Sequence, residues 1–477
     1  MVGLAGSSVR LVPVVRSFVA DTVTPIAAYL ALRTPGRSCL LESVEGTDRI
    51  ARYSFIGLDY LETLVLDRDP EMFARLRETL ARYRIDDATR VLANVPFPGG
   101  AVCTFGYDAA RVLERLGRRP PHDVEVPDCE AVVPGVWVVF DHFTHRLTLI
   151  GLATPGLPVA SVEARLDAYV ARLQQVRTSV PGPVAARGPV AASFDEPGFL
   201  AAVARAQRAI YEGDVYQLQL GIRFSSRLEG DPFDVYRQIR TRNPSPYMFF
   251  IESGERATFG ASPEFLVRLD AGRARLRPLA GTRPRGGTPD ADVALAAELL
   301  ANEKERAEHV MLVDLGRNDL GAVCATGSVR VDELMVIERY SHVMHIVSNV
   351  TGRLAPGRDA LDLFAAAFPA GTVTGAPKIR AMQIIDELEP VARGFYAGSV
   401  AHVHFDGDMD SCIVLRSVAT SGGRAYWQAS AGIVADSDPR AEYAEIFAKT
   451  RIVREVLGVE SPSTIGVESP STVGIES

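Results

Sequence analysis

The apolar and polar positions of residues 9–155 follow mainly the two-residue period of β-strands. Apolar and polar residues alternate over residues 38–44, and an apolar run fills residues 132–140, so each segment predicts a strand. Thr24-Pro25 predicts the start of a helix, because proline is well tolerated in a first turn. A second helix is predicted at about 158–177. The first third of the chain is therefore expected to be β-rich with a few helices.

Proline and glycine interrupt this pattern at residues 180–189, which predicts a linker and a boundary between two parts of the chain. Beyond the linker, the pattern predicts helices and strands in irregular alternation. The elements are a helix over 196–212 that ends at Gly213 and strands over 215–224 and 247–252.

The segments 399–405 and 411–418 flank Asp406-Gly407, and Asp-Gly between two apolar segments is typical of a β-hairpin. Asp406, Asp408 and Asp410 also resemble part of a calcium-binding loop. The terminal glutamate of that motif is missing, so the hairpin turn is the better interpretation.

The end of the chain has a composition of its own. From residue 458, the unit Gly-Val-Glu-Ser-Pro-Ser-Thr-Ile recurs at a period of eight residues. Its serine, proline and threonine content and its lack of large side chains predict a disordered tail over 458–477.

The composition excludes several classes of protein. Of the 477 residues, 47% are hydrophobic and 23% charged, which is ordinary for a globular protein with a large core. A formal net charge of −8 argues against nucleic acid as the main partner. Five cysteines without a Cys-x-x-Cys pair argue against a disulfide framework or a zinc site. No apolar run reaches membrane-spanning length, and the N-terminus lacks the order of a signal peptide, so we expect a cytoplasmic location.

Two predicted helices each contain a pair of glutamates three residues apart. These are Glu305 and Glu308 in one helix and Glu442 and Glu445 in the other. Residues three apart share a helix face, so each helix presents two carboxylates in one direction. Four carboxylates directed at one place would repel each other without a cation, and Mg²⁺ commonly joins such oxygens to an anionic substrate. Taken alone, either pair is more often an ordinary solvated helix face.

Glycine-rich and cationic positions of the second part indicate an anionic substrate. Residues 278–286 form a turn with two arginines, in which Gly281 would let backbone N–H groups approach a ligand. Residues 371–378 form a second such loop, and Pro377 predicts the start of a helix whose exposed N–H groups attract anions. Arg416, predicted on the strand after the hairpin, would need a carboxylate partner if it were buried.

Two other features have an ordinary alternative. Lys449 follows Glu445 by four residues, so it is equally consistent with an ion pair along a helix. His342 and His345 are three residues apart. Such histidines are more often structural, but a near-neutral pKa makes either one a candidate for proton transfer.

Three long motifs make a family likeness specific: NEKERAEHVMLVDLGRNDLG, FPAGTVTGAPKIRAMQIIDELEP and ADSDPRAEY. On these motifs the chain resembles the chorismate-utilising enzymes, and within them the large, aminase subunit of anthranilate synthase. The likeness covers residues 9–457. It implies an α+β fold like that of anthranilate synthase component I, a sandwich of antiparallel sheets with flanking helices.

The resemblance implies a metal site and a substrate site. Glu308 and Glu445 would bind Mg²⁺ directly and Glu305 and Glu442 through water, and the ion would hold the ring carboxylate of chorismate. The positions that match those gripping the carboxylates of chorismate are Gly281, Thr282, Thr372, Tyr396, Arg416, Gly432 and Lys449.

The resemblance also assigns catalytic positions. Glu264 matches a general acid that protonates the departing 4-hydroxyl, and His345 matches a histidine linked to pyruvate elimination. Water-using relatives have a lysine base where this chain has Gln217, and an amide is no general base at neutral pH. Aminodeoxychorismate synthases have a lysine nucleophile where this chain has Ala280, which forms no covalent adduct. Attack by ammonia at C2, followed by loss of pyruvate to give anthranilate, is therefore expected.

A feedback site for tryptophan is implied by residues 40–46 and 243–248, although both segments are also consistent with ordinary core strands. The positions that match its lining are Leu41, Ser43, Asn243, Pro246, Tyr247, Met248 and Cys412. The expected domains are a regulatory domain over 9–180, a chorismate-binding catalytic domain over 190–457 and the tail over 458–477.

The expected function is that of an Mg²⁺-dependent anthranilate synthase large subunit, a lyase of tryptophan biosynthesis under feedback inhibition. No cysteine lies in the Gly-x-Cys-x-Gly motif of a glutaminase, so a separate glutamine amidotransferase subunit is expected to supply ammonia in a hetero-oligomer. Ser430 and Ile446 depart from the family's usual glycine and threonine. Ser430 keeps open a 2-amino-2-deoxyisochorismate synthase of a secondary pathway. A third possibility is a catalytically silent tryptophan-sensing subunit.

Overall fold

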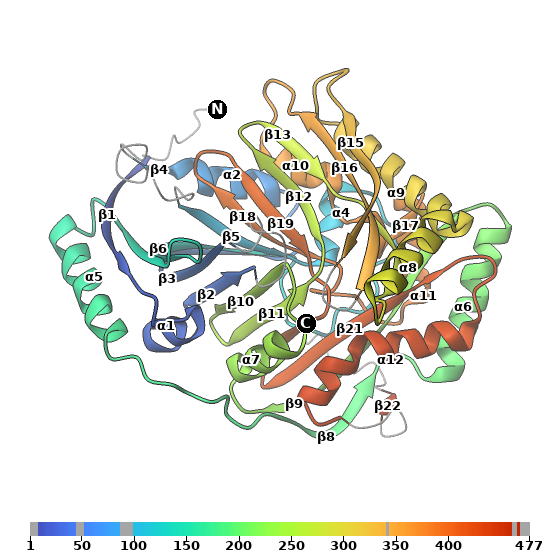
Figure 1. Cartoon of the computed structure of the whole chain (residues 1–477), viewed down its shortest axis with the longest axis horizontal. Helices are drawn as coiled ribbons and strands as arrows, with labels where there is room; N and C mark the ends of the chain where they lie inside the picture. Colours follow the sequence, from blue (N-terminus) through green and yellow to red (C-terminus); the bar gives the residue numbers. More distant parts are fainter. Residues whose placement is uncertain (1–7, 44–51, 86–98, 340–342, 460–464, 468–477) are drawn as a thin grey trace, which may run out of the picture.

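The computed structural model describes residues 8–43, 52–85, 99–339, 343–459 and 465–467 (Figure 1). Its strands pair in two rows that share the long strand β6 (Cys129–Asp141), which pairs with β3, β5 and β7. All pairing between the main strands of both rows is antiparallel.

The first row runs from β1 to β8 in space. Its strands, in order, are β1 (Val9–Val19), β7 (Arg146–Ala153), β6, β3 (Tyr53–Leu66), β2 (Ser38–Glu42), β10 (Tyr247–Ser253), β11 (Arg256–Ser262), β20 (Ser417–Ser421), β21 (Arg424–Ile433), β9 (Gln217–Glu229) and β8 (Ala185–Ala192). Three short strands extend this row: β4 (Tyr83–Ile85) beside β1, β17 (Gly375–Ala376) beside β9 and β22 (Ile465–Val467) beside β8.

The second row leaves β6 in the other direction and ends at β16, which β14 and β15 flank. Its strands are β5 (Gly100–Phe105), β18 (Ser399–His404), β19 (Met409–Ile413), β12 (Phe265–Asp270), β13 (Arg273–Leu276), β16 (Val343–Arg353), β14 (Leu279–Pro284) and β15 (Arg330–Arg339). Strands from before and after residue 185 are therefore neighbours in both rows, as in the pairs β2–β10 and β5–β18.

Helices cover the outside of the rows (Figure 1). They are α1 (Pro25–Leu32), α2 (Met72–Arg82), α4 (Ala110–Leu113), α5 (Val159–Leu173), α6 (Glu196–Tyr211), α7 (Pro232–Arg242), α8 (Pro289–Ala301), α9 (Glu303–Gly321), α10 (Ala360–Ala367), α11 (Lys378–Leu388) and α12 (Pro439–Val456), with 3₁₀ turns η1 (Tyr107–Ala109) and η2 (Gly371–Val373).

The alternation of side chains along β10 explains how one sheet joins two cores. Met248 and Phe250 pack in the core beneath α1, α5, α6, α7, α11 and α12. Phe249 and Ile251 point the other way, into the core shared with β5, β18 and β19. Both faces of the strand are thus apolar, and fully burying one such side chain contributes roughly 1.5–3 kcal/mol. The expected α+β sandwich of antiparallel sheets is confirmed.

Most predicted elements form close to their expected places. The helices at 158–177 and 196–212 are α5 and α6, and the hairpin around Asp406-Gly407 is β18–β19. Two expectations were wrong in detail. Residues 185–189 of the predicted linker belong to strand β8, because β9 offers a free edge to pair with. The helix after residues 371–378 begins at Lys378, with Pro377 as its N-cap rather than its first residue.

The state of the cysteines agrees with the prediction of no disulfide framework. All five cysteines are buried and unpaired as thiols. No helix in the described part of the chain is long and apolar enough to cross a membrane. In the tail, residues 465–467 pair with β8 in parallel, and residues 460–464 and 468–477 lie outside the described residues.

Candidate functional site

Side-chain caps explain why the two acidic helices begin where they do. Asn302 accepts a hydrogen bond from the backbone N–H of Glu305 at the start of α9, and Asp438 accepts one from Ala441 at the start of α12. Such a cap contributes about 1 kcal/mol. The caps place Glu305 and Glu442 in the first turns of their helices, where the positive end of the helix dipole favours negative charge. Glu308 and Glu445 follow one turn later.

The glutamates of α9 and α12 lie close enough for their charges to interact, and both helices lie in the right half of Figure 1. Burial raises the pKa of Glu308, and the carboxylates of Glu305 and Glu445 raise it further. Burial also raises the pKa of Glu442, and Glu445 adds to that shift. Lys304 opposes both shifts. Carboxylates from distant segments therefore form one acidic cluster.

Cationic side chains hold two members of this cluster. Arg283 donates to the carboxylate of Glu305 at 3.0 Å. The ammonium of Lys449 lies 2.6 Å from the carboxylate of Glu445 and donates to the backbone carbonyl of Ser430 at 2.8 Å. Because these pairs are partly exposed, each contributes no more than about 1 kcal/mol, and a ligand can replace them at small cost.

Strand β9 directs two glutamines toward the acidic helices. Gln217 is buried, and its amide lies close enough to the carboxylate of Glu308 to oppose the rise in the pKa of that group. Gln219 shares that face of the strand, because residues two apart do so, and it accepts a hydrogen bond from the hydroxyl of Ser430 at 2.8 Å. The position next to the acidic cluster thus contains an amide and no general base.

The turn at 278–286 forms the strand β14, which has an irregularity between Ala280 and Thr282. Ala280 is buried and lies opposite Ile346 of β16. Gly281 has a φ of 70°, and a β-carbon there would lie 3.0 Å from a carboxylate oxygen of Glu305. Glycine therefore permits both the backbone conformation and the approach of the acidic side chain.

His345 lies on β16 beside this irregularity. Its Nδ1 is 3.0 Å from the carbonyl oxygen of Gly281 and 3.0 Å from the hydroxyl of Thr282. A carbonyl only accepts, so Nδ1 carries the proton and Nε2 is the basic nitrogen of the neutral ring. Burial lowers the pKa of His345, and the positive charge of Arg416 lowers it too, which favours the neutral ring at pH 7.

Glu264 lies between β11 and β12, opposite the 371–373 turn. Burial raises its pKa to about 8. The hydroxyl of Thr372 donates to both carboxyl oxygens at 3.4 Å, which opposes the shift only in part. A cavity of about 50 Å³ adjoins both side chains. Glu264 therefore keeps its proton at neutral pH, as a general acid must.

Tyr396, Gly432 and Lys449 gather around β21. The hydroxyl of Tyr396 is buried and lies 2.8 Å from the hydroxyl of Ser430. Gly432 is two residues further along the strand, where a β-carbon would lie 3.0 Å from the amide nitrogen of Gln219. These three positions thus surround the same section of β9 and β21.

Arg416 does not lie on a strand, contrary to the sequence-based expectation. β19 ends at Ile413 and β20 begins at Ser417, and Arg416 is an exposed residue in the bend between them. Its φ is 48°, a conformation uncommon for residues other than glycine. The bend brings its charge close to His345.

A separate cavity of about 360 Å³ lies between the two rows of strands, away from the acidic helices. Six of the seven positions matched to a tryptophan site line it: Leu41, Ser43, Pro246, Tyr247, Met248 and Cys412. Asn243, the seventh, does not line the cavity and is the C-cap of α7.

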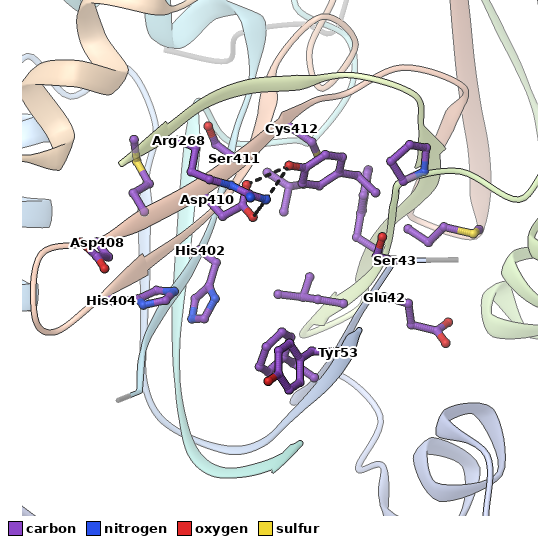
Figure 2. Close-up of a pocket in the computed structure, with 18 of the residues that line it drawn as sticks. Glu42, Ser43, Tyr53, Arg268, His402, His404, Asp408, Asp410, Ser411 and Cys412 are labelled. Carbon is purple, nitrogen blue, oxygen red and sulfur yellow. Dashed lines mark hydrogen bonds and ion pairs between the residues drawn. The ribbon is translucent and has the colours of Figure 1, made fainter. Parts of the chain in front are cut away.

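The polar groups of the cavity differ in their hydrogen bonding (Figure 2). Asp410 accepts hydrogen bonds from Tyr247 at 3.0 Å and from Arg268. On the opposite side from His402 and His404, the buried hydroxyl of Ser43 has no hydrogen-bond partner among the described residues. A buried donor without a partner costs roughly 1–3 kcal/mol, so a polar ligand group near Ser43 would be stabilised.

A model of the chorismate binding enzyme family matches residues 37–455. The chain belongs to this family. It is similar to anthranilate synthase component 1 of Streptomyces coelicolor, with 45% identity over 92% of this chain and 88% of the relative. It is also similar to anthranilate synthase component 1 of Thermus thermophilus, with 44% identity over 93% of this chain and 97% of the relative. This protein is therefore a chorismate-utilising enzyme.

Solved structures support the same fold. Anthranilate synthase component I from Streptococcus pneumoniae superposes with a TM-score of 0.77 at 34% identity, over 92% of this chain and 99% of that chain. The menaquinone-specific isochorismate synthase of Escherichia coli has a TM-score of 0.73 at 20% identity, over 94% and 95%. At that identity the second likeness concerns the fold alone.

The acidic cluster of this chorismate-binding enzyme fits Mg²⁺ by the chemistry of its donors rather than as a closed cage. Its oxygens are hard ligands, and burial together with mutual repulsion raises the pKa of Glu308, which a divalent cation would reverse. No three of the four glutamates place ligand atoms within 4.8 Å of one another among the described residues. Such an open arrangement suits an ion that keeps water and binds substrate.

A different group does reach that spacing. Asp108, His122 and Asp128 offer ligand atoms within 4.8 Å of one another. Arginines already neutralise its carboxylates: Arg111 donates to Asp108 at 2.7 Å and Arg119 to Asp128 at 2.6 Å. We therefore interpret this group as an ion-pair network of the fold.

Sequence reasoning missed Gln219 and Arg283 as members of the site. The alternation Gln217-Leu-Gln219-Leu in a buried strand was the available signal for Gln219. Arg283 belongs to the turn with two arginines, but nothing in the sequence pairs it with Glu305. His342, also weighed for proton transfer, lies outside the described residues.

Proposed function

We propose that this chorismate-utilising enzyme is the large subunit of an anthranilate synthase, a lyase that converts chorismate and ammonia to anthranilate and pyruvate. The observation on which this depends most is the half-buried carboxyl of Glu264 beside Thr372, whose pKa of about 8 keeps it protonated at neutral pH. The departing 4-hydroxyl needs a proton to leave as water, and a positioned acid typically contributes a factor of about 100 to 10,000.

The substrate would lie between Glu264 and the acidic helices. Glu308 and Glu445 would hold Mg²⁺ directly, with Glu305 and Glu442 acting through water. When bound, the ion supplies positive charge to the ring carboxylate of chorismate. The remaining carboxylate would meet donors from Lys449, Tyr396 and the backbone around Gly281 and Gly432.

The choice of nucleophile follows from two side chains. Gln217 offers an amide beside Glu308, so it does not deprotonate water. Ala280 has no nucleophilic atom. Ammonia needs no base to attack, so its nitrogen bonds to C2 while the double bonds shift and the 4-hydroxyl leaves with the proton of Glu264.

The second step would use His345. Its Nε2 is the basic nitrogen of a ring that Gly281 orients through Nδ1. Loss of the C2 proton and of the enolpyruvyl group as pyruvate gives the aromatic ring of anthranilate. A neutral histidine with a fixed tautomer is suited to such a proton transfer.

Ammonia supply and regulation complete the proposal. The relatives are named component 1, and this chain has no cysteine in a glutaminase motif, so we propose a glutamine amidotransferase as the second subunit. The cavity around Ser43 and Tyr247 would bind tryptophan as feedback inhibitor. The cytoplasm is the expected location of such an enzyme.

A second candidate shares the amination step but retains the enolpyruvyl group, giving 2-amino-2-deoxyisochorismate. The hydroxyl of Ser430 against Tyr396 is the feature that favours it, because it adds a polar group to the substrate pocket.

Product analysis separates these possibilities. Purified protein with chorismate, Mg²⁺ and ammonium is expected to produce fluorescent anthranilate and an equal amount of pyruvate. A product that retains the enolpyruvyl group by mass would select the second candidate. Tryptophan binding without any turnover of chorismate would select a silent sensing subunit and overturn the proposal.

A further inference from the structure

Ser430 contacts side chains from three separate parts of the chain: Gln219 on β9, Tyr396 in a turn and Lys449 on α12. It lies on β21 and is 3% exposed. Its hydroxyl is 2.8 Å from the hydroxyl of Tyr396 and 2.8 Å from Oε1 of Gln219. Its backbone carbonyl accepts the hydrogen bond from Lys449 at 2.8 Å. One buried residue thus contacts both Tyr396 and Lys449, which the proposed function assigns to the substrate carboxylates.

The number of protons fixes the direction of these hydrogen bonds. A serine hydroxyl has one proton and accepts with its lone pairs. Ser430 donates that proton to Oε1 of Gln219, so it accepts from Tyr396. Burial raises the pKa of Tyr396, so its hydroxyl stays protonated. The single proton of Tyr396 is therefore engaged by Ser430 before a substrate arrives.

We propose that Ser430 is a positioning residue that sets the affinity for chorismate by competing for the proton of Tyr396. To donate to a substrate carboxylate, Tyr396 must first give up its hydrogen bond to Ser430. Each carboxylate bound by Tyr396 therefore replaces an existing bond and adds less affinity than it would in a site without the serine hydroxyl. This inference rests on the proposed function, because it takes Tyr396 as a substrate-binding group.

The carbonyl of Ser430 contributes a separate and constant effect. It holds the ammonium of Lys449, but every residue at this position has a carbonyl, so substitution leaves that contact in place. Changes at residue 430 therefore act on Tyr396 and Gln219 alone.

The test compares Ser430→Ala with the parent enzyme in steady-state turnover of chorismate. Freeing one neutral hydrogen bond is worth about a fivefold change in an equilibrium constant. We expect KM for chorismate to fall about fivefold, with kcat changed less than twofold. Ser430→Thr, which keeps the hydroxyl, is expected to restore the parent KM.

A double substitution isolates the competition from general packing. In a Tyr396→Phe background, Ser430→Ala is expected to leave KM unchanged, because no phenol proton remains to compete for. Ser226→Ala is the matched control, since its buried hydroxyl donates only to backbone carbonyls, those of Arg187 on β8 and Arg227 on β9.

The outcomes distinguish failure of the proposed role of Ser430 from failure of the proposed function. An unchanged or raised KM in Ser430→Ala, or the same fall in KM with and without Tyr396, would overturn the role of Ser430 while leaving the proposed function intact. Absence of chorismate turnover in the parent protein would instead defeat the proposed function. Thermal unfolding of each variant, at a Tm near that of the parent, confirms that it is folded.

Discussion

The acidic cluster of this enzyme and the cavity between its two rows of strands are built in opposite ways. Glu305, Glu308, Glu442 and Glu445 come from two helices, repel one another and leave an open arrangement. The cavity lies between paired strands and has a volume of about 360 Å³. In its wall, Tyr247 and Arg268 donate hydrogen bonds to Asp410. Like charges need a cation to bring the glutamates together, whereas the cavity is already formed by the packing of the strands.

The difference predicts which substitutions stay local. Changes in the acidic cluster or at the general acid should remove turnover without affecting ligand binding in the cavity. Changes in the cavity should alter inhibition and leave turnover. The following experiments test that separation.

Replacement of Glu264, the proposed general acid, should have the largest effect. Glu264→Gln keeps the size of the side chain but cannot donate the required proton, so kcat should fall by a factor of about 100 to 10,000. Anthranilate fluorescence measures the rate, and calorimetry with tryptophan should give the parent affinity. A variant that keeps more than a tenth of the activity would exclude Glu264 as the acid.

Loss of one proposed metal ligand should come next. Glu308→Gln removes a charge from the cluster, and turnover should fall at least about 100-fold at fixed Mg²⁺. Glu303→Gln, one of the exposed residues at the start of α9, is the matched control and should keep parent activity. Equal Mg²⁺ dependence of Glu308→Gln and the parent would place the ion elsewhere.

Filling the cavity should separate inhibition from catalysis. Ser43→Phe introduces a ring where the buried hydroxyl of Ser43 points, and overpacking of this kind costs about 1–3 kcal/mol. Tryptophan affinity should fall about tenfold or more, and kcat should remain within about twofold of the parent. Retained inhibition would mean that tryptophan binds outside this cavity.

The pH dependence should give the smallest effect. The pKa of Glu264 is raised to about 8, so the active, protonated acid is present below that pH and is lost as the pH rises through it. Between pH 7 and pH 8.5 the rate should fall about fourfold. Burial lowers the pKa values of His402 and His404, so neither gains or loses charge over this range, and they should not affect inhibition. A flat rate profile would contradict the assignment of the acid.

The sequence predicted the parts of the site that depend on local signals. The helices α9 and α12 were predicted together with their glutamates, and in the structure Asn302 and Asp438 cap them. Asp406-Gly407 fixed the hairpin in the same way. These features need only a few neighbouring residues to form.

Features set by long-range contacts were missed. Arg416 lies in a bend with a left-handed backbone conformation, which interrupts the predicted strand. No glycine or proline beside it predicts that bend. Residues 185–189 resemble a linker, but the edge of β9 pairs with them. The contact of Arg283 with Glu305 joins a turn to a helix through tertiary packing. Each of these features depends on which elements pack against each other, and local sequence patterns do not specify that packing.

In the proposed active site, carboxylates from α9 and α12 act together around a divalent ion that anchors chorismate. A titration of Mg²⁺ into metal-free protein with saturating chorismate and ammonium tests it most directly, with anthranilate fluorescence as the signal. We expect no product without the ion, a saturable rise in product with it, and loss of that rise in both Glu308→Gln and Glu445→Gln. Full turnover in excess chelator would contradict it.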